Sequence, residues 1–191
     1  MRHKSTADLR DLVQSCLSHG INHFETAAMY MSGKSERDYG DVLSSIDRDR
    51  FIIQTKVRPE PNRQQFREKV LASMARLRVD RLDLLGFHGV NHPIHYEDVV
   101  NHCLPEARLM QEEGLLGHIG LSSHAPTPLL LECVESGVFD YVNLHYHFIG
   151  SYVSTGTSAR GAPDAGNLCV IRAAEGLDMG VFIISPMDKG G

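Results

Sequence analysis

His23-Phe-Glu-Thr-Ala-Ala-Met-Tyr30 is the first of three strand-like segments that decide the fold of this chain. The second is Phe51-Ile-Ile-Gln-Thr-Lys56, and the third is Leu82-Asp-Leu-Leu-Gly-Phe-His88. Each segment ends in a residue that can exchange a proton or carry charge, and the first also contains a carboxylate, Glu25. In a barrel of alternating strands and helices, the carboxyl ends of the strands carry the chemistry. A phenol, an amine, an imidazole and a carboxylate at these ends suit protonation of a carbonyl oxygen during reduction.

Strand and helix patterns alternate over the whole chain. Strands are predicted at 21–26, 51–57, 82–88, 117–122, 140–145 and 181–185. Helices are predicted at 7–19, 35–43, 62–77 with Asn62 as the cap, 97–113, 127–136 and 167–179, and a surface loop at 150–166. No hairpin signal separates the strands, so the alternation indicates a parallel sheet with helical crossovers. Nearly continuous apolar runs are typical of strands buried on both faces.

Six strands are fewer than a closed eightfold barrel contains. The chain has 191 residues, whereas a complete barrel of this kind has about 250. The predicted pattern opens on a helix and stops just after a strand. We therefore expect residues 1–191 to form a single α/β barrel domain that is incomplete at both ends, with the first and last strands missing.

Composition and charge narrow the classes of partner. The formal net charge of -5 provides no basic face, so nucleic acid is not expected to bind. No apolar run approaches the roughly 20 residues of a membrane helix, and the first residues lack the apolar part of a secretory signal. The four cysteines are far apart and form no Cys-x-x-Cys pair, as in proteins of a reducing compartment. A cytoplasmic protein without membrane contacts is predicted, and its oligomeric state stays open.

Further motifs follow the three segments in a fixed order. They are Gly33-Lys-Ser-Glu36, Gly117-His-Ile-Gly-Leu-Ser-Ser123, Asp140-Tyr-Val-Asn-Leu-His-Tyr146 and Ile184-Ser-Pro-Met187. Together with the three segments, at this order and spacing, they resemble the aldo/keto reductase family over nearly the whole chain. The resemblance implies a parallel (β/α)8 barrel and the reduction of a small aldehyde or ketone by hydride from NADPH.

The resemblance also implies a role for each of four catalytic residues. Tyr30 would be the general acid that protonates the carbonyl oxygen. Lys56 would favour the phenolate of that tyrosine, and Glu25 would pair with Lys56. His88 would donate a hydrogen bond to the carbonyl oxygen and orient it. The family usually has Asp where this chain has Glu25, so one extra methylene has to be accommodated.

Four residues correspond to cofactor contacts of the family. Ser122 and Asn143 would bind the nicotinamide carboxamide, Ser123 stands beside them, and Ser185 begins the loop that wraps the pyrophosphate. The common pattern has Asn in place of Ser123 and Gln in place of Asn143. The preference between NADPH and NADH cannot be read from these residues, so NADH is not excluded, and the identity of the carbonyl substrate is equally open.

Two other classes of function are weighed beside the reductase. His88, His92 and His95, the last two in a loop around Pro93, and the pair His145-Tyr-His147 are potential zinc ligands of a metal-dependent barrel hydrolase. No third ligand is positioned by a recognisable pattern, so no metal is predicted. A third hypothesis is a catalytically inactive barrel fragment that acts in assembly through its exposed sheet edges. NADPH binding and bound zinc distinguish the three.

Overall fold

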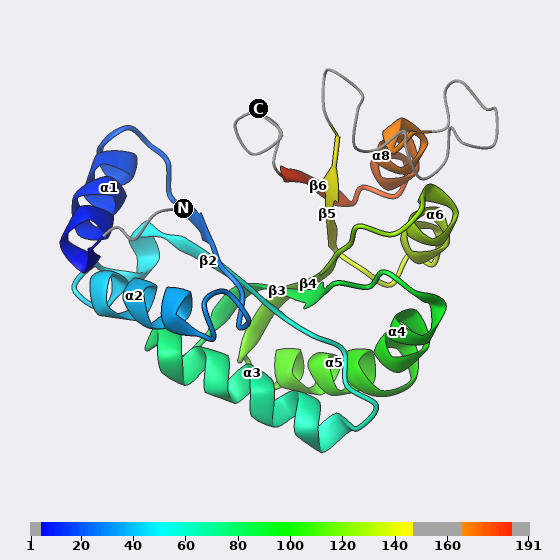
Figure 1. Cartoon of the computed structure of the whole chain (residues 1–191), viewed down its shortest axis with the longest axis horizontal. Helices are drawn as coiled ribbons and strands as arrows, with labels where there is room; N and C mark the ends of the chain where they lie inside the picture. Colours follow the sequence, from blue (N-terminus) through cyan, green and yellow to red (C-terminus); the bar gives the residue numbers. More distant parts are fainter. Residues whose placement is uncertain (1–4, 147–165, 185–191) are drawn as a thin grey trace.

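Six parallel strands form one sheet in which neighbours in sequence are neighbours in space. The structure is a computed structural model and is described for residues 5–146 and 166–184. The sheet order is β1-β2-β3-β4-β5-β6. The strands are β1 His23–Glu25, β2 Ile52–Val57, β3 Leu82–His88, β4 Leu116–Ser122, β5 Tyr141–His145 and β6 Gly180–Ile184. The sheet curls into a half barrel with the helices on its outer side (Figure 1), so the predicted incomplete α/β barrel is confirmed.

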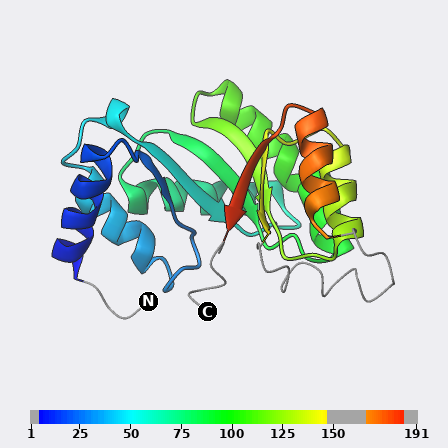
Figure 2. The same ribbon diagram turned by 90° about the horizontal axis from the view of Figure 1, so that it is seen from above.

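The helices alternate with the strands and cover the convex face of the sheet. They are α1 Thr6–Ser18, α2 Lys34–Leu43, α3 Arg63–Leu77, α4 Pro93–Asp98, α5 Leu104–Glu112, α6 Thr127–Glu135 and α8 Leu168–Gly176, with a 3-10 turn η1 Arg48–Arg50 and a π-helical turn η2 Val99–Cys103. Figure 2 shows α1 and α2 near one end of the sheet and α6 and α8 near the other. No helix in the described part of the chain has the length and apolar content of a membrane span.

Local sequence signals explain most of these boundaries, with one correction. Asn62 caps α3 as predicted, because its side chain accepts a hydrogen bond from the backbone N–H of Gln65 at 3.0 Å. The helix expected at 97–113 begins earlier, at Pro93, and reaches α5 through η2. Proline fits the first turn of a helix because its missing N–H would have no partner there. His95 therefore lies in a helix and not in the predicted loop.

Alternation along the strands separates the core from the side chains of the concave face. Thr55 hydrogen-bonds to Glu36 of α2, and Phe87 packs against Phe66 of α3 with 5.5 Å between ring centroids. These side chains therefore point towards the helices, where the apolar core lies. Successive strand residues point to opposite faces. Lys56 and His88, each next to one of them, consequently face the inside of the half barrel.

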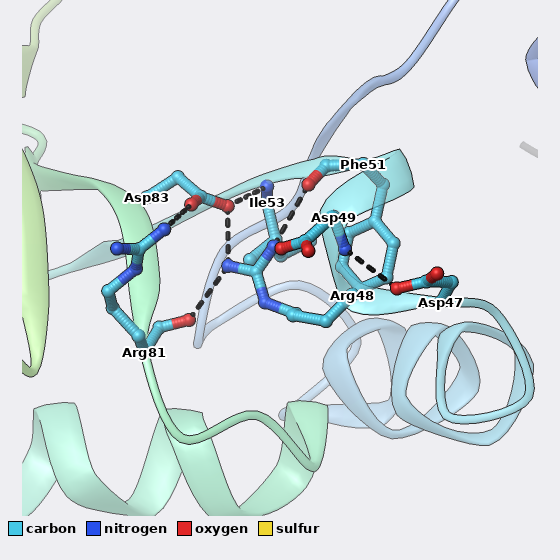
Figure 3. Close-up of polar contacts among 7 residues, drawn as sticks. All are labelled: Asp47, Arg48, Asp49, Phe51, Ile53, Arg81 and Asp83. Atoms are coloured by element: carbon cyan, nitrogen blue, oxygen red, sulfur yellow. Dashed lines mark hydrogen bonds and ion pairs between the residues drawn. The ribbon is translucent and has the colours of Figure 1, made fainter.

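A polar cluster ties the amino ends of β2 and β3 together (Figure 3). Asp83 accepts a hydrogen bond from the backbone N–H of Ile53 at 2.8 Å and pairs with Arg48 at 2.6 Å. Arg48 also donates to the backbone carbonyls of Phe51 at 2.9 Å and Arg81 at 3.1 Å. Because these contacts lie at the end opposite to His88, we assign them to stability and not to chemistry.

Replacing Asp83 with alanine is expected to lower the free energy of unfolding by about 2 kcal/mol, since a backbone donor and a guanidinium both lose their acceptor. Urea denaturation followed by circular dichroism measures this change. Asp80→Ala removes the same charge from an exposed residue nearby and is expected to change stability by less than about 0.5 kcal/mol. Equal effects of the two replacements would contradict the role of Asp83.

Candidate active site

The structure brings the four predicted catalytic residues together at the carboxyl ends of β1, β2 and β3. Glu25 ends β1 and forms an ion pair with Lys56, whose side chain is 1% exposed. Tyr30 lies in the loop after β1, with its ring centroid 5.1 Å from Nζ of Lys56. Its ring meets that of His88 edge to face at 5.7 Å. The Glu25–Lys56 ion pair, the phenol of Tyr30 and the imidazole of His88 therefore lie around one point at the mouth of the half barrel, which we call the reacting point.

Backbone contacts place the loop that carries Tyr30. After β1 the chain continues along β2, and the N–H of Ala28 donates to the carbonyl of Lys56 at 3.0 Å. Glu36, at the start of α2, is fully buried and accepts hydrogen bonds from Thr55 and from Arg76, each at 2.6 Å. The motif around Glu36 thus fastens the loop to β2 and α3. Tyr30 is held over Lys56 by this framework, although its side chain is 43% exposed.

His88 is an uncharged imidazole at neutral pH. Burial, followed by the positive charges of Lys56 and Arg58 and by His124, lowers the pKa of His88 to about 4. Its Nδ1 is buried without a hydrogen-bond partner among the described residues. A ligand can therefore reach the ring only through Nε2. A neutral imidazole with one accessible nitrogen can act as a directed hydrogen-bond donor.

This depressed pKa predicts an acid-sensitive fold. The unfolded chain binds a proton on His88 near pH 6.5, whereas the folded chain binds it only near pH 4. The unfolded state therefore holds more protons in this window, and stability falls as the pH falls. We expect a loss on the order of 2–3 kcal/mol between pH 6.5 and 4, which His88→Asn removes.

Urea denaturation at a series of pH values tests this expectation. His102→Asn, in η2, is the matched control and should retain the acid sensitivity of the unmodified protein. An unchanged pH dependence in His88→Asn would show that other groups cause it.

A chain of hydrogen bonds extends the Glu25–Lys56 pair across the interior. Nδ2 of Asn143 donates to Glu25 at 3.3 Å, and Nε2 of Gln54 donates to Oδ1 of Asn143 at 2.9 Å. Oε1 of Gln54 in turn accepts from Nε2 of His23 at 3.0 Å. Because a carboxylate can only accept, Glu25 fixes the direction of every amide in the chain. Asn143 and Gln54, both fully buried, therefore have defined orientations.

Tyr141 closes the interior beneath this network. Its ring is almost completely buried, and burial raises the pKa of its phenol well above the usual value. The hydroxyl lies 3.4 Å from Nε2 of Gln54. A Cβ added at Gly120 would come within 2.6 Å of the Tyr141 ring, so only glycine leaves room for this ring.

The sequence analysis did not identify Gln54 and Tyr141 as parts of the site. Gln54 could have been found from its position, because it is a polar residue two positions before Lys56 and therefore lies on the same inward face of β2.

The predicted cofactor residues occupy neighbouring strand ends. Ser122 pairs in register with His88 on one side and Asn143 on the other. Ser122 is 2% exposed, and its hydroxyl makes no hydrogen bond to a described residue. The hydroxyl of Ser123 is used internally, because it donates to the carbonyl of Val90 at 2.6 Å and accepts from the N–H of Ala125 at 3.0 Å. Ser185 lies outside the described residues.

The metal hypothesis finds no ligand set in the part of the chain that is described. Within residues 5–146 and 166–184, no three His, Cys, Asp or Glu side chains are grouped so that they could hold a metal ion. The rings of His124 and His145 lie 4.5 Å apart, and His92 and His95 lie 5.2 Å apart, but each is a pair. His147 falls outside the described residues.

Comparison with curated proteins finds relatives among oxidoreductases. The uncharacterised oxidoreductase Mb2320 of Mycobacterium bovis is 31% identical over 122 residues, which are 63% of this chain and 36% of that protein. D-arabinose 1-dehydrogenase of Saccharomyces cerevisiae is 33% identical over 126 residues, 61% of this chain and 36% of that protein. The matches thus span little more than a third of the length of these relatives.

Solved structures confirm the fold, and a match to a family model identifies the family of the chain. An aldo-keto reductase from Klebsiella pneumoniae in complex with NADPH superimposes with a TM-score of 0.75 at 18% identity, covering 99% of this chain and 61% of that chain. The model of the aldo/keto reductase family matches residues 2–148, which include Tyr30 in the loop after β1 and the strands that end in Lys56 and His88. The motifs, the half barrel and this match agree, and the chain belongs to the aldo/keto reductase family.

Proposed function

We propose that this protein reduces an aldehyde or ketone with hydride from NADPH, with Tyr30 as the general acid. The observation that carries the proposal is the buried Lys56–Glu25 pair beneath Tyr30, beside the neutral His88. A phenol gives up its proton more readily when a cation stabilises the phenolate. Lys56 supplies that charge, and Glu25 keeps the ammonium group in place.

The positions of Tyr30 and His88 suggest separate roles for the two residues. A carbonyl oxygen bound between Tyr30 and His88 would accept one hydrogen bond from the phenol and one from the imidazole. As hydride reaches the carbonyl carbon, the oxygen takes the Tyr30 proton, so the products are an alcohol, NADP⁺ and a phenolate that is reprotonated from solvent. The neutral state of His88 suits this role, because the ring can donate without acting as a competing strong acid.

The residues at the ends of β4 and β5 fit a carboxamide in their chemistry. NADPH, when bound, supplies the hydride. The Ser122 hydroxyl makes no hydrogen bond within the described residues, and Asn143 keeps a second amide hydrogen after its bond to Glu25. We propose that these two groups hold the nicotinamide carboxamide and that Ser123 and Ser185 are further contacts of the cofactor. The NADPH in the Klebsiella pneumoniae relative supports this choice of cofactor.

The compartment and the extent of the chain are parts of the same proposal. None of the four cysteines forms a disulfide, which fits a reducing cytoplasm. We propose one barrel domain over residues 1–191 and a small carbonyl compound as the partner.

Fluorescence titration of the purified chain with NADPH, repeated with NADH, tests the proposal. Saturable binding, tighter for NADPH, followed by aldehyde-dependent oxidation of NADPH at 340 nm, is the expected result. A folded chain that binds neither dinucleotide would refute the proposal for this chain and favour the assembly hypothesis. Zinc in the purified protein together with hydrolase activity would favour the metal hypothesis instead.

A further inference from the structure

A cavity of about 220 Å³ adjoins the candidate active site. It lies between the loop after β1, the carboxyl ends of β2 and β3, and α3. Its lining includes Met29, Lys56, Arg58, Lys69, Arg76 and His88. Since Lys56 and His88 line it, a substrate held at the reacting point would extend the rest of its structure towards this cavity.

Four of the nine residues that line this cavity are lysines or arginines, and three of the four are paired with carboxylates. These pairs are Lys56 with Glu25, Lys69 with Glu60, and Arg76 with Glu36. One positive charge is left over, and it belongs to Arg58. A cavity with an excess cation and low-dielectric walls attracts anions.

Arg58 is available for a ligand. It is exposed, it follows directly after β2, and its guanidinium makes no hydrogen bond or ion pair with any residue in the described part of the chain. Its charge nevertheless reaches the reacting point, because it contributes to lowering the pKa of His88. A guanidinium presents a planar set of donors that matches a carboxylate with two parallel hydrogen bonds.

We propose that Arg58 binds an anionic group on the carbonyl substrate, so that the preferred substrates are aldehydes or ketones that carry a carboxylate. The inference rests on the proposed function and adds the chemical class of its substrate. One carboxylate placed in the cavity would balance the unpaired charge of Arg58 while leaving the three existing pairs intact. A phosphate group would offer the same chemistry, and the experiment separates the two.

Paired aldehydes of equal shape test the proposal. With saturating NADPH, kcat/KM is measured for 4-formylbenzoate and for its neutral isostere 4-formylbenzamide, and again for the two meta isomers. We expect kcat/KM to be about ten-fold higher for the carboxylate than for the amide, because one charge-assisted hydrogen bond that is partly exposed to solvent contributes modestly. The preference should reside in KM and weaken as KCl is raised, because salt screens an exposed pair. Glyceraldehyde 3-phosphate against glyceraldehyde forms the phosphate arm, and a preference seen only there would overturn the carboxylate assignment.

Arg58→Gln should reduce the preference to within about two-fold, through a higher KM for the carboxylate. Arg63→Gln, which removes the same charge from an exposed residue outside the cavity lining, should keep the preference. Equal kcat/KM for acid and amide in the unmodified protein would overturn the inference while the proposed function stands. A larger dissociation constant for NADPH in Arg58→Gln would also overturn the inference, because it would assign the arginine to binding of the cofactor.

Calorimetry separates this inference from the proposed function. Binding of 4-formylbenzoate and not of 4-formylbenzamide, lost in Arg58→Gln, would support the anion site even if neither aldehyde were reduced. Binding of neither aldehyde, with no turnover, would overturn both proposals.

Discussion

Tyr30→Phe is expected to lower kcat/KM for carbonyl reduction about 1,000-fold, within the range that a general acid contributes. The replacement keeps the ring that meets His88 at 5.7 Å and removes only the hydroxyl. That hydroxyl makes no hydrogen bond within the described residues, so folding should be unaffected. The dissociation constant for NADPH should change less than two-fold, because the expected cofactor contacts lie on β4 and β5.

Steady-state assays at 340 nm and NADPH fluorescence titration measure the two quantities. Tyr96→Phe, in α4, is the matched control and should retain the activity of the unmodified protein. Undiminished turnover in Tyr30→Phe would remove this residue from the acid role. Loss of both turnover and NADPH binding would indicate instead that Tyr30 shapes the cofactor site.

The strands and their order were predictable because their signals are local. Each strand is a short apolar run, each helix has its own periodicity and stop signal, and parallel βα units connect neighbours in the sheet. Lys56 and His88 end the runs that predict β2 and β3, and the structure places them at those ends. The pairing of Glu25 with Lys56 was implied by the resemblance to the aldo/keto reductase family, and the longer side chain of glutamate still reaches the ammonium group.

The network behind these residues could not be predicted in the same way. Gln54 meets Asn143 across 89 positions of sequence, and Asn143 meets Glu25 across 118. Such contacts depend on how far the sheet curls and on the stagger of its strands, which no local pattern encodes. The packing of Tyr141 over Gly120 has the same origin, since the space for its ring comes from a glycine on the neighbouring strand. The sequence alone also does not distinguish Arg58 from the other cations of the cavity, because the ion pairs of Lys56, Lys69 and Arg76 are known only from the structure.

Lys56→Met is expected to lower kcat/KM about 100-fold and the free energy of unfolding by about 2–3 kcal/mol. Two separate causes contribute. Turnover falls because no cation stabilises the phenolate as Tyr30 gives up its proton. Stability falls because Glu25 keeps a partly buried carboxylate, 28% exposed, without its counter-ion. The single variant alone cannot separate the two effects.

The double variant Glu25→Gln with Lys56→Met separates them. Replacing both members of a buried ion pair by neutral groups costs far less stability than removing one. Most of the lost stability should therefore return, measured by urea denaturation, while kcat/KM stays about 100-fold low. If turnover recovered together with stability, Lys56 would be a structural residue only, and the acid would owe its reactivity to another group. A persistent defect in a stable protein would leave the missing ammonium charge as the cause, because the phenol, the imidazole and the amide of Asn143 are all still in place.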